Sequence, residues 1–138
     1  MMPKRAEEPI SVNEFRHLLE NISRGKGFPR KRRQQHVLLK SAVLLLEPGQ
    51  DYPERQINDT LQKWLDTVGK SIEIDHVSLR RRLVDEGYLI RDRAGRRYRV
   101  DEGKADNIFE PAINALNPVA VIEEAEQRRA LRKRAFLG

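Results

Sequence analysis

The sequence predicts an α+β fold that is mostly helical, and three observations support this class. Apolar residues recur with helical spacing through much of residues 12–86. Tyr52 precedes a proline, which biases it towards an extended conformation and predicts a short strand between two helices. Two alternating segments flank Gly95 within 88–100 and predict a β-hairpin. The resulting order of helix, short strand, helix, helix and hairpin is that of a winged helix-turn-helix.

An additional helix is expected before this unit. Residues 1–10 are predicted to be disordered. Ser11 and Glu14 have the spacing of a capping box, so a helix should run over about 12–23. Two glycines follow it and mark a boundary. Residues 11–27 are therefore predicted to be an N-terminal helix with its linker.

The winged-helix domain itself is predicted over 28–103. Pro29 suits the first turn of a helix, and the apolar run that follows is typical of a central core helix. A second helix should begin at Pro53, with Trp64 as its largest buried side chain. A capping aspartate begins the third helix, predicted over 75–86, and a glycine then leads into the hairpin.

The third helix carries three consecutive arginines that differ in their expected exposure. At about 100° per residue, Arg80 shares a broad apolar sector that includes Val77. An unpaired buried guanidinium is costly, so Arg80 should pair with Asp59 or Asp92 and serve the fold. The polar side of the helix holds the candidates for contact with a ligand, which are Ser78, Arg81 and Arg82.

Basic residues also gather in the hairpin and before the core helix. The hairpin arginines suit contact with a nucleic-acid backbone, because a planar guanidinium fits phosphate bidentately. The basic run 30–33 lies unfavourably against the positive end of a helix dipole, and either phosphate or solvent would compensate it. A solvated polar surface is the alternative for both groups. The candidate contact residues are Arg93, Arg96, Arg97, Arg30, Lys31, Arg32 and Arg33.

Net charge and composition favour a polyanionic partner. The formal net charge is +6 and the isoelectric point is about 9.9, so counterion release would drive association with nucleic acid. An acidic membrane would satisfy the same charge, but the longest apolar run, 42–46, is far below the roughly 18 residues of a spanning helix. The sequence has no apolar leader at its start and no cysteine. We therefore expect a cytoplasmic protein without disulfides.

Residues 104–138 are predicted to form a helical extension. Pro118 is a good start for a helix that continues to about residue 135, with glutamates early and arginines late, as the helix dipole favours. Its apolar stripe is thin, so this helix needs a partner surface. One hypothesis is a two-fold homodimer through 117–136, with the acidic half against the basic half of a second copy. A solvated extension is the alternative.

The sequence offers no catalytic constellation. The histidines at 17, 36 and 76 lie far apart, and none has metal-ligand spacing to another. Asp75, His76 and Ser78 are close neighbours on one helix and cannot form a nucleophile relay that faces a common pocket. No glycine-rich phosphate loop follows a strand. We expect a non-enzymatic protein that needs no cofactor and no metal.

A set of residues in 28–100 forms a pattern of moderate specificity. Its members are Phe28, Pro29, Tyr52, Glu54, Ile57, Asn58, Leu61, Asp75, His76, Leu79, Arg80, Arg81, Leu83, Val84, Gly87, Leu89, Arg91, Gly95 and Tyr98. In these residues the chain resembles an uncharacterised bacterial domain of unknown function, which often occurs alone or beside helix-turn-helix regulators. The resemblance implies a winged-helix-like architecture and a role linked to DNA, without an assigned reaction.

These observations together predict a double-stranded DNA-binding protein, a small bacterial transcriptional regulator. Helix 75–86 would enter the major groove, and the wing would reach phosphates or the minor groove. The alternative is a protein-interaction module in which the same basic surface binds an acidic partner. RNA binding is less favoured, because aromatic residues make up only 6% of the chain and leave few stacking platforms.

Overall fold

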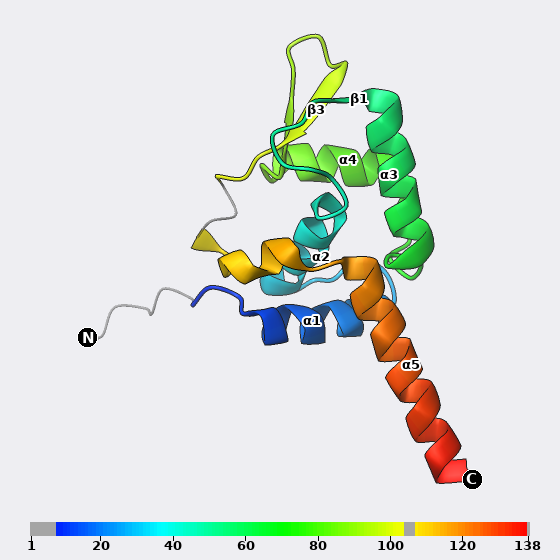
Figure 1. The fold of residues 1–138 in the computed structure, drawn as a ribbon. Helices are drawn as coiled ribbons and strands as arrows, with labels where there is room; N and C mark the ends of the chain where they lie inside the picture. The colour runs from blue at the N-terminus through cyan, green and yellow to red at the C-terminus, as the bar shows by residue number, and fades with distance from the viewer. Residues whose placement is uncertain (1–7, 104–106, 138) are drawn as a thin grey trace.

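The computed structural model describes residues 8–103 and 107–137, and within them the fold is α+β and mostly helical (Figure 1). The predicted start 1–10 therefore lies mostly outside the described residues. The helices are α1 (Val12–Arg24), α2 (Arg32–Val43), α3 (Glu54–Thr67), α4 (His76–Asp85), the 3-10 helix η2 (Pro111–Ala115) and α5 (Pro118–Leu137). The strands are β1 (Tyr52–Pro53), β2 (Leu89–Arg91) and β3 (Arg97–Val100).

The strands form one antiparallel sheet in the order β1-β3-β2. The predicted short strand at Tyr52 is confirmed, and this residue pairs with Tyr98 of β3. The predicted hairpin is confirmed as well, with Leu89 opposite Val100. Because side chains alternate along a strand, Tyr98 and Val100 are buried while the arginines between and before them are exposed. The hairpin thus keeps one face for the core and another for water.

The buried side chains form one core cluster with α2 at its centre. Every residue of 37–43 is buried, as expected for a helix that is covered on all sides. Trp64 of α3 is fully buried, and its indole N–H donates to Ser41 Oγ of α2 at 3.0 Å. This bond satisfies the polar atom of the largest core side chain and fixes α3 against α2.

The core helix begins later than predicted. Pro29 does not form its first turn; Lys31 is still extended, with φ −73° and ψ 132°, and α2 begins at Arg32. The first turn contains basic residues, no acidic residue and no side-chain cap, so its charges oppose the helix dipole. The helix starts where its first two arginines meet carboxylates from other elements.

The capping box before α1 is only half formed. Ser11 accepts the backbone N–H of Glu14 at 3.1 Å, as predicted. The Glu14 carboxylate, however, accepts from Arg33 of α2 at 2.5 and 2.6 Å. A charged partner outweighs a single backbone N–H, so this glutamate joins two helices rather than capping one.

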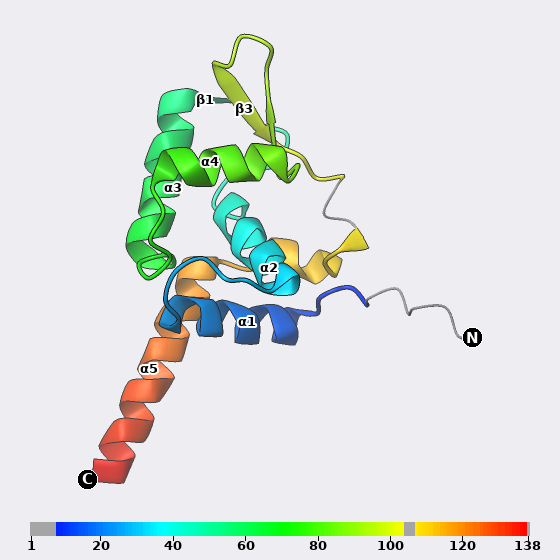
Figure 2. The ribbon, with the colours of Figure 1, turned by 180° about the vertical axis from the view of Figure 1, so that it is seen from behind.

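The start of the described chain and the segment that follows the hairpin are packed against the same core. Ile10, predicted to belong to the disordered start, is fully buried and forms a parallel bridge with Phe109. Phe109 in turn contacts the ring of Phe15 edge to face, with 6.0 Å between centroids. The first turns of α5 are buried as well, whereas its later turns project from the molecule (Figures 1 and 2).

Candidate nucleic-acid interface

Helix α4 presents a short polar face to water. Asp75 caps it by accepting the backbone N–H of Ser78 at 2.7 Å, and this bond lowers the pKa of the aspartate. Leu79 and Leu83 are fully buried. The opposite face, which is exposed, consists of Ser78, Arg81 and Asp85. Val77, expected in the apolar sector, is 40% exposed, because it lies at the edge of that sector in the first turn.

Arg82 does not point freely into water as predicted. Its guanidinium carbon lies 4.7 Å from the centroid of the Phe28 ring, and its Nη2 donates to Gln35 Oε1 at 3.4 Å. The side chain is half-buried, and its Nε has no hydrogen-bond partner among the described residues. A cation over an aromatic face is attracted by the ring quadrupole, so this arginine packs α4 against the segment that precedes α2.

Arg80 points inward and joins three elements. Its Nη2 lies 3.1 Å from Glu54 Oε1 in the first turn of α3, and its Nη1 donates to Asn58 Oδ1 one turn later. Its guanidinium carbon lies 5.6 Å from the centroid of the Tyr98 ring in β3. The predicted partners, Asp59 and Asp92, were wrong: the carboxylate on the facing side of α3 is Glu54.

The basic run before the core helix divides into two pairs of residues. Arg32 forms an ion pair with Glu86 at the end of α4, with 3.0 Å from Nη1 to Oε1, and lowers the pKa of that carboxyl. Arg33 pairs with Glu14, whose pKa it also lowers. Arg30 and Lys31 are exposed. The structure therefore gives two of the four predicted contact residues a role in joining helices.

The tip of the hairpin is a tight turn held by the side chain and the backbone carbonyl of Asp92. Asp92 Oδ1 accepts the backbone N–H of Arg96 at 2.9 Å, which lowers the pKa of the aspartate. Gly95 has φ +71°, and the guanidinium of Arg91 lies where a Cβ at this position would be. The predicted contact residues of this turn are all exposed, and they are Arg93, Arg96 and Arg97.

The base of the hairpin is fixed to the rest of the fold. Tyr88 is buried, burial raises its pKa, and its hydroxyl lies 2.7 Å from Nδ1 of His36 in α2. The other end of the hairpin is fixed as well, because the backbone N–H of Glu54 donates to the carbonyl of Arg96, beside the turn, at 3.1 Å. Figure 2 shows the result: α4 crosses the molecule and the hairpin rises above it. The exposed arginines thus stand on a rigid support.

Three exposed arginines near this surface were not among the predicted contact residues, and they are Arg55, Arg91 and Arg99. Arg99 lies on the outward face of β3, opposite Ile90. Arg55 lies in the first turn of α3, next to the strand that pairs with β3. The alternation of the hairpin indicated Arg99. Nothing local indicated Arg55, because its position beside the hairpin depends on the pairing of β1 with β3.

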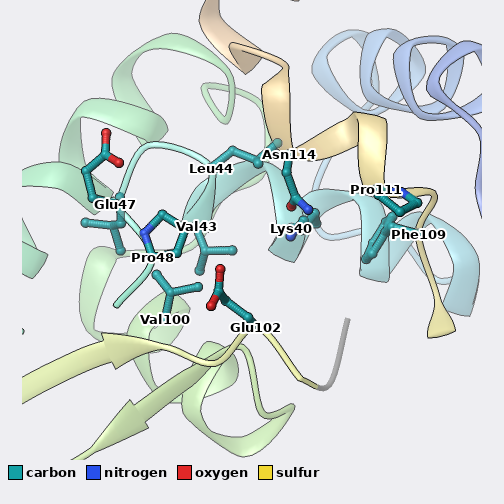
Figure 3. A pocket seen from close by; sticks show the side chains of 11 residues that line it. Lys40, Val43, Leu44, Glu47, Pro48, Val100, Glu102, Phe109, Pro111 and Asn114 are labelled. Carbon is teal, nitrogen blue, oxygen red and sulfur yellow. The ribbon is translucent and has the colours of Figure 1, made fainter. Parts of the chain in front are cut away.

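A pocket of about 240 Å³ opens between the end of α2, the end of β3 and the segment before η2 (Figure 3). The ammonium group of Lys40 lies 5.8 Å from the Phe109 ring centroid, and the carboxylates of Glu47 and Glu102 lie at the margin. No residue of α4 lines this pocket. It is therefore a feature separate from the basic face.

Within 8–103 and 107–137, no three histidine or carboxylate side chains gather into a group that could hold a metal ion. Over the same ranges, no helix has both the length and the apolar character needed to cross a bilayer.

The profile of a family described as "Uncharacterized protein conserved in bacteria (DUF2087)" matches residues 24–100. The match runs from the last residue of α1 to the last residue of β3, and so includes α4 and the hairpin. Neither the curated proteins nor the solved structures yielded a match.

Proposed function

We propose that this chain, which belongs to the uncharacterised bacterial family DUF2087, is a winged-helix protein that binds double-stranded DNA as a small transcriptional regulator. The element order from α2 to β3 and the sheet order β1-β3-β2 support this architecture. In it, α3 and α4 are the helix-turn-helix pair, α4 is the recognition helix, and the β2–β3 hairpin is the wing.

One observation carries the proposal: α4, which bears the exposed Arg81, packs against the hairpin, which bears further exposed arginines. Arg81 and Ser78 on α4 are suited to base edges in the major groove. The arginines of the wing turn, 93, 96 and 97, are suited to phosphates or the minor groove. Arg30 and Lys31 add backbone contacts before α2.

Two of the predicted contact residues, Arg82 and Arg32, position this surface instead of contacting DNA. Arg82 packs on Phe28, and Arg32 ties the end of α4 to α2 through Glu86. Their charge contributes to the field around the site, but their guanidinium groups are engaged within the fold. Fewer arginines are therefore proposed to contact DNA than the sequence alone predicted.

The salt dependence of binding tests this function. If about five phosphates are neutralised, the logarithm of the association constant should fall with the logarithm of salt concentration at a slope near −4 to −5. Fluorescence anisotropy of a labelled short duplex, from about 50 to about 200 mM salt, measures this slope. The same titration with a structured RNA of equal length is the comparison.

The competing interpretations give different results. Equal or tighter binding to the RNA would indicate an RNA-binding protein. An association constant that does not change with salt concentration, or no binding to either nucleic acid, would contradict the proposal. Either result would favour a protein-interaction module that binds an acidic partner.

A further inference from the structure

The second half of α5 is exposed and strongly basic. The first half is held to the body by Val121, Ile122 and Ala125, which are buried, and an ion pair of 2.6 Å joins Arg128 to Glu20 of α1. Beyond this point the helix projects from the molecule (Figures 1 and 2). Its apolar side chains there are largely in water: Leu131 is 63% exposed, Phe136 91% and Leu137 74%.

A groove of about 120 Å³ lies beside the first half of the same helix. Thr67 and Lys70, at the end of α3, form one side of it. The apolar part of the groove comes from Val119 and Ile122, and its α5 margin carries the carboxylates of Glu123 and Glu126. A segment that fits this groove would place an apolar side chain on Val119 and a positive charge beside the two carboxylates. An anionic segment is disfavoured, because those carboxylates would repel it.

One face of α5 is complementary to itself in an antiparallel arrangement. Spacings of four and three residues place six positions along this face, Val119, Glu123, Glu126, Ala130, Lys133 and Leu137. When a second copy runs antiparallel about residue 128, Val119 lies opposite Leu137, and Glu123 lies opposite Lys133. Glu126 lies opposite Ala130, which leaves room for the long side chains around it. A two-fold axis repeats every one of these pairs.

We propose that two copies of the chain pair through this face of α5, each placing the end of its helix in the groove of the other. Leu137 then covers Val119, which is only partly buried within one chain, and Lys133 meets Glu123. Charge complementarity selects this occupant, because the α5 margin of the groove carries two carboxylates and the end of α5 is basic. The pairing does not depend on the proposed DNA binding, since it is formed by the opposite end of the molecule (Figure 1).

The apolar area of this contact is small and its charges are exposed, so the dimer should be weak and sensitive to salt. Sedimentation velocity without nucleic acid, from about 1 µM to about 1 mM protein at low salt, tests it. We expect a shift from the monomer mass towards twice that mass within this range.

Charge reversal provides the decisive comparison. Glu123→Lys and Lys133→Glu each place like charges opposite each other twice, so each should raise the dimer dissociation constant by roughly tenfold or more. The double variant Glu123→Lys/Lys133→Glu restores opposite charges and should dimerise like the original chain. Mixing the two single variants should give a mixed dimer. Positions 123 and 133 are too far apart on one helix for contact within a chain.

A matched pair of apolar substitutions distinguishes docking in the groove from nonspecific hydrophobic association. Leu137→Ser should weaken the dimer, whereas Leu131→Ser, which removes another largely exposed leucine from a different side of the helix, should not. A monomer at every concentration would overturn the inference. So would a dimer that both single reversals leave unchanged, or one that Leu131→Ser weakens as much as Leu137→Ser.

Discussion

Replacement of Arg81 by alanine is expected to weaken binding of a short duplex by about tenfold to a hundredfold, the range that one good bidentate base contact supplies. Arg81 lies on the exposed face of α4. Because its side chain makes no hydrogen bond or ion pair with the residues that the structure describes, its loss should leave the free energy of unfolding nearly unchanged. Fluorescence anisotropy at one fixed salt concentration measures the affinity, and thermal unfolding checks the fold.

The wing should respond differently from α4. The triple variant Arg93→Ala/Arg96→Ala/Arg97→Ala removes phosphate contacts, so binding should weaken uniformly across duplex sequences and the salt slope should lose about three units. The matched control for Arg81→Ala is Arg24→Ala, which removes one arginine at the exposed end of α1, away from the site. If Arg24→Ala weakens binding as much as Arg81→Ala does, the affinity reflects net charge alone and the assigned interface is wrong.

Arg80→Met should combine a loss of stability with a loss of binding. The variant keeps the apolar stem but removes the bonds to Glu54 and Asn58 and the stacking on Tyr98. We expect the free energy of unfolding to fall by about 1–3 kcal/mol, a modest range because Glu54 is half exposed and remains solvated when it loses its partner. Urea unfolding measures this change.

The salt slope distinguishes positioning from contact in this variant. Arg80 joins α4 to α3 and to β3, so its loss should lower duplex affinity while the slope stays as in the original chain. A slope reduced by about one unit would show that Arg80 itself neutralises a phosphate. Glu54→Gln, which keeps the contacts of Arg80 to Asn58 and Tyr98, should cost less than Arg80→Met in both measurements.

Local features of the sequence were sufficient to predict most of the elements. The cap at Asp75, the proline after Tyr52 and the glycine at 95 each act within a few residues, and the structure places an element boundary or turn at each of them. Helix periodicity likewise identified the buried leucines of α4. Such signals operate before tertiary contacts form, which is why a single sequence reveals them.

The partners of the charged residues required tertiary information. Arg82 and Arg33 look equally free in the sequence, yet one lies over the ring of Phe28 and the other on Glu14. These pairs join segments that are 54 and 19 positions apart, and no periodic pattern records them. The bridge between Ile10 and Phe109 is of the same kind, since it depends on where the chain returns after the hairpin.

The candidate surface was predictable in composition but not in extent. The exposure of Arg97 and Arg99 follows from alternation along β3, and that of Arg93 and Arg96 follows from their place in the turn. The basic run before α2 was overestimated, because Arg32 and Arg33 meet carboxylates from α4 and α1. Arg55 was missed, because only the pairing of β1 with β3 brings the first turn of α3 beside the wing.

The central claim is that α4 and the wing together form the surface that meets a DNA duplex. Mapping of backbone amide chemical shifts during titration with a short duplex tests it most directly. We expect the largest changes at Ser78, Arg81 and residues 93–97, with little change in α1. Changes confined to residues 126–137, or no changes in α4 and the wing at saturating duplex, would contradict the claim.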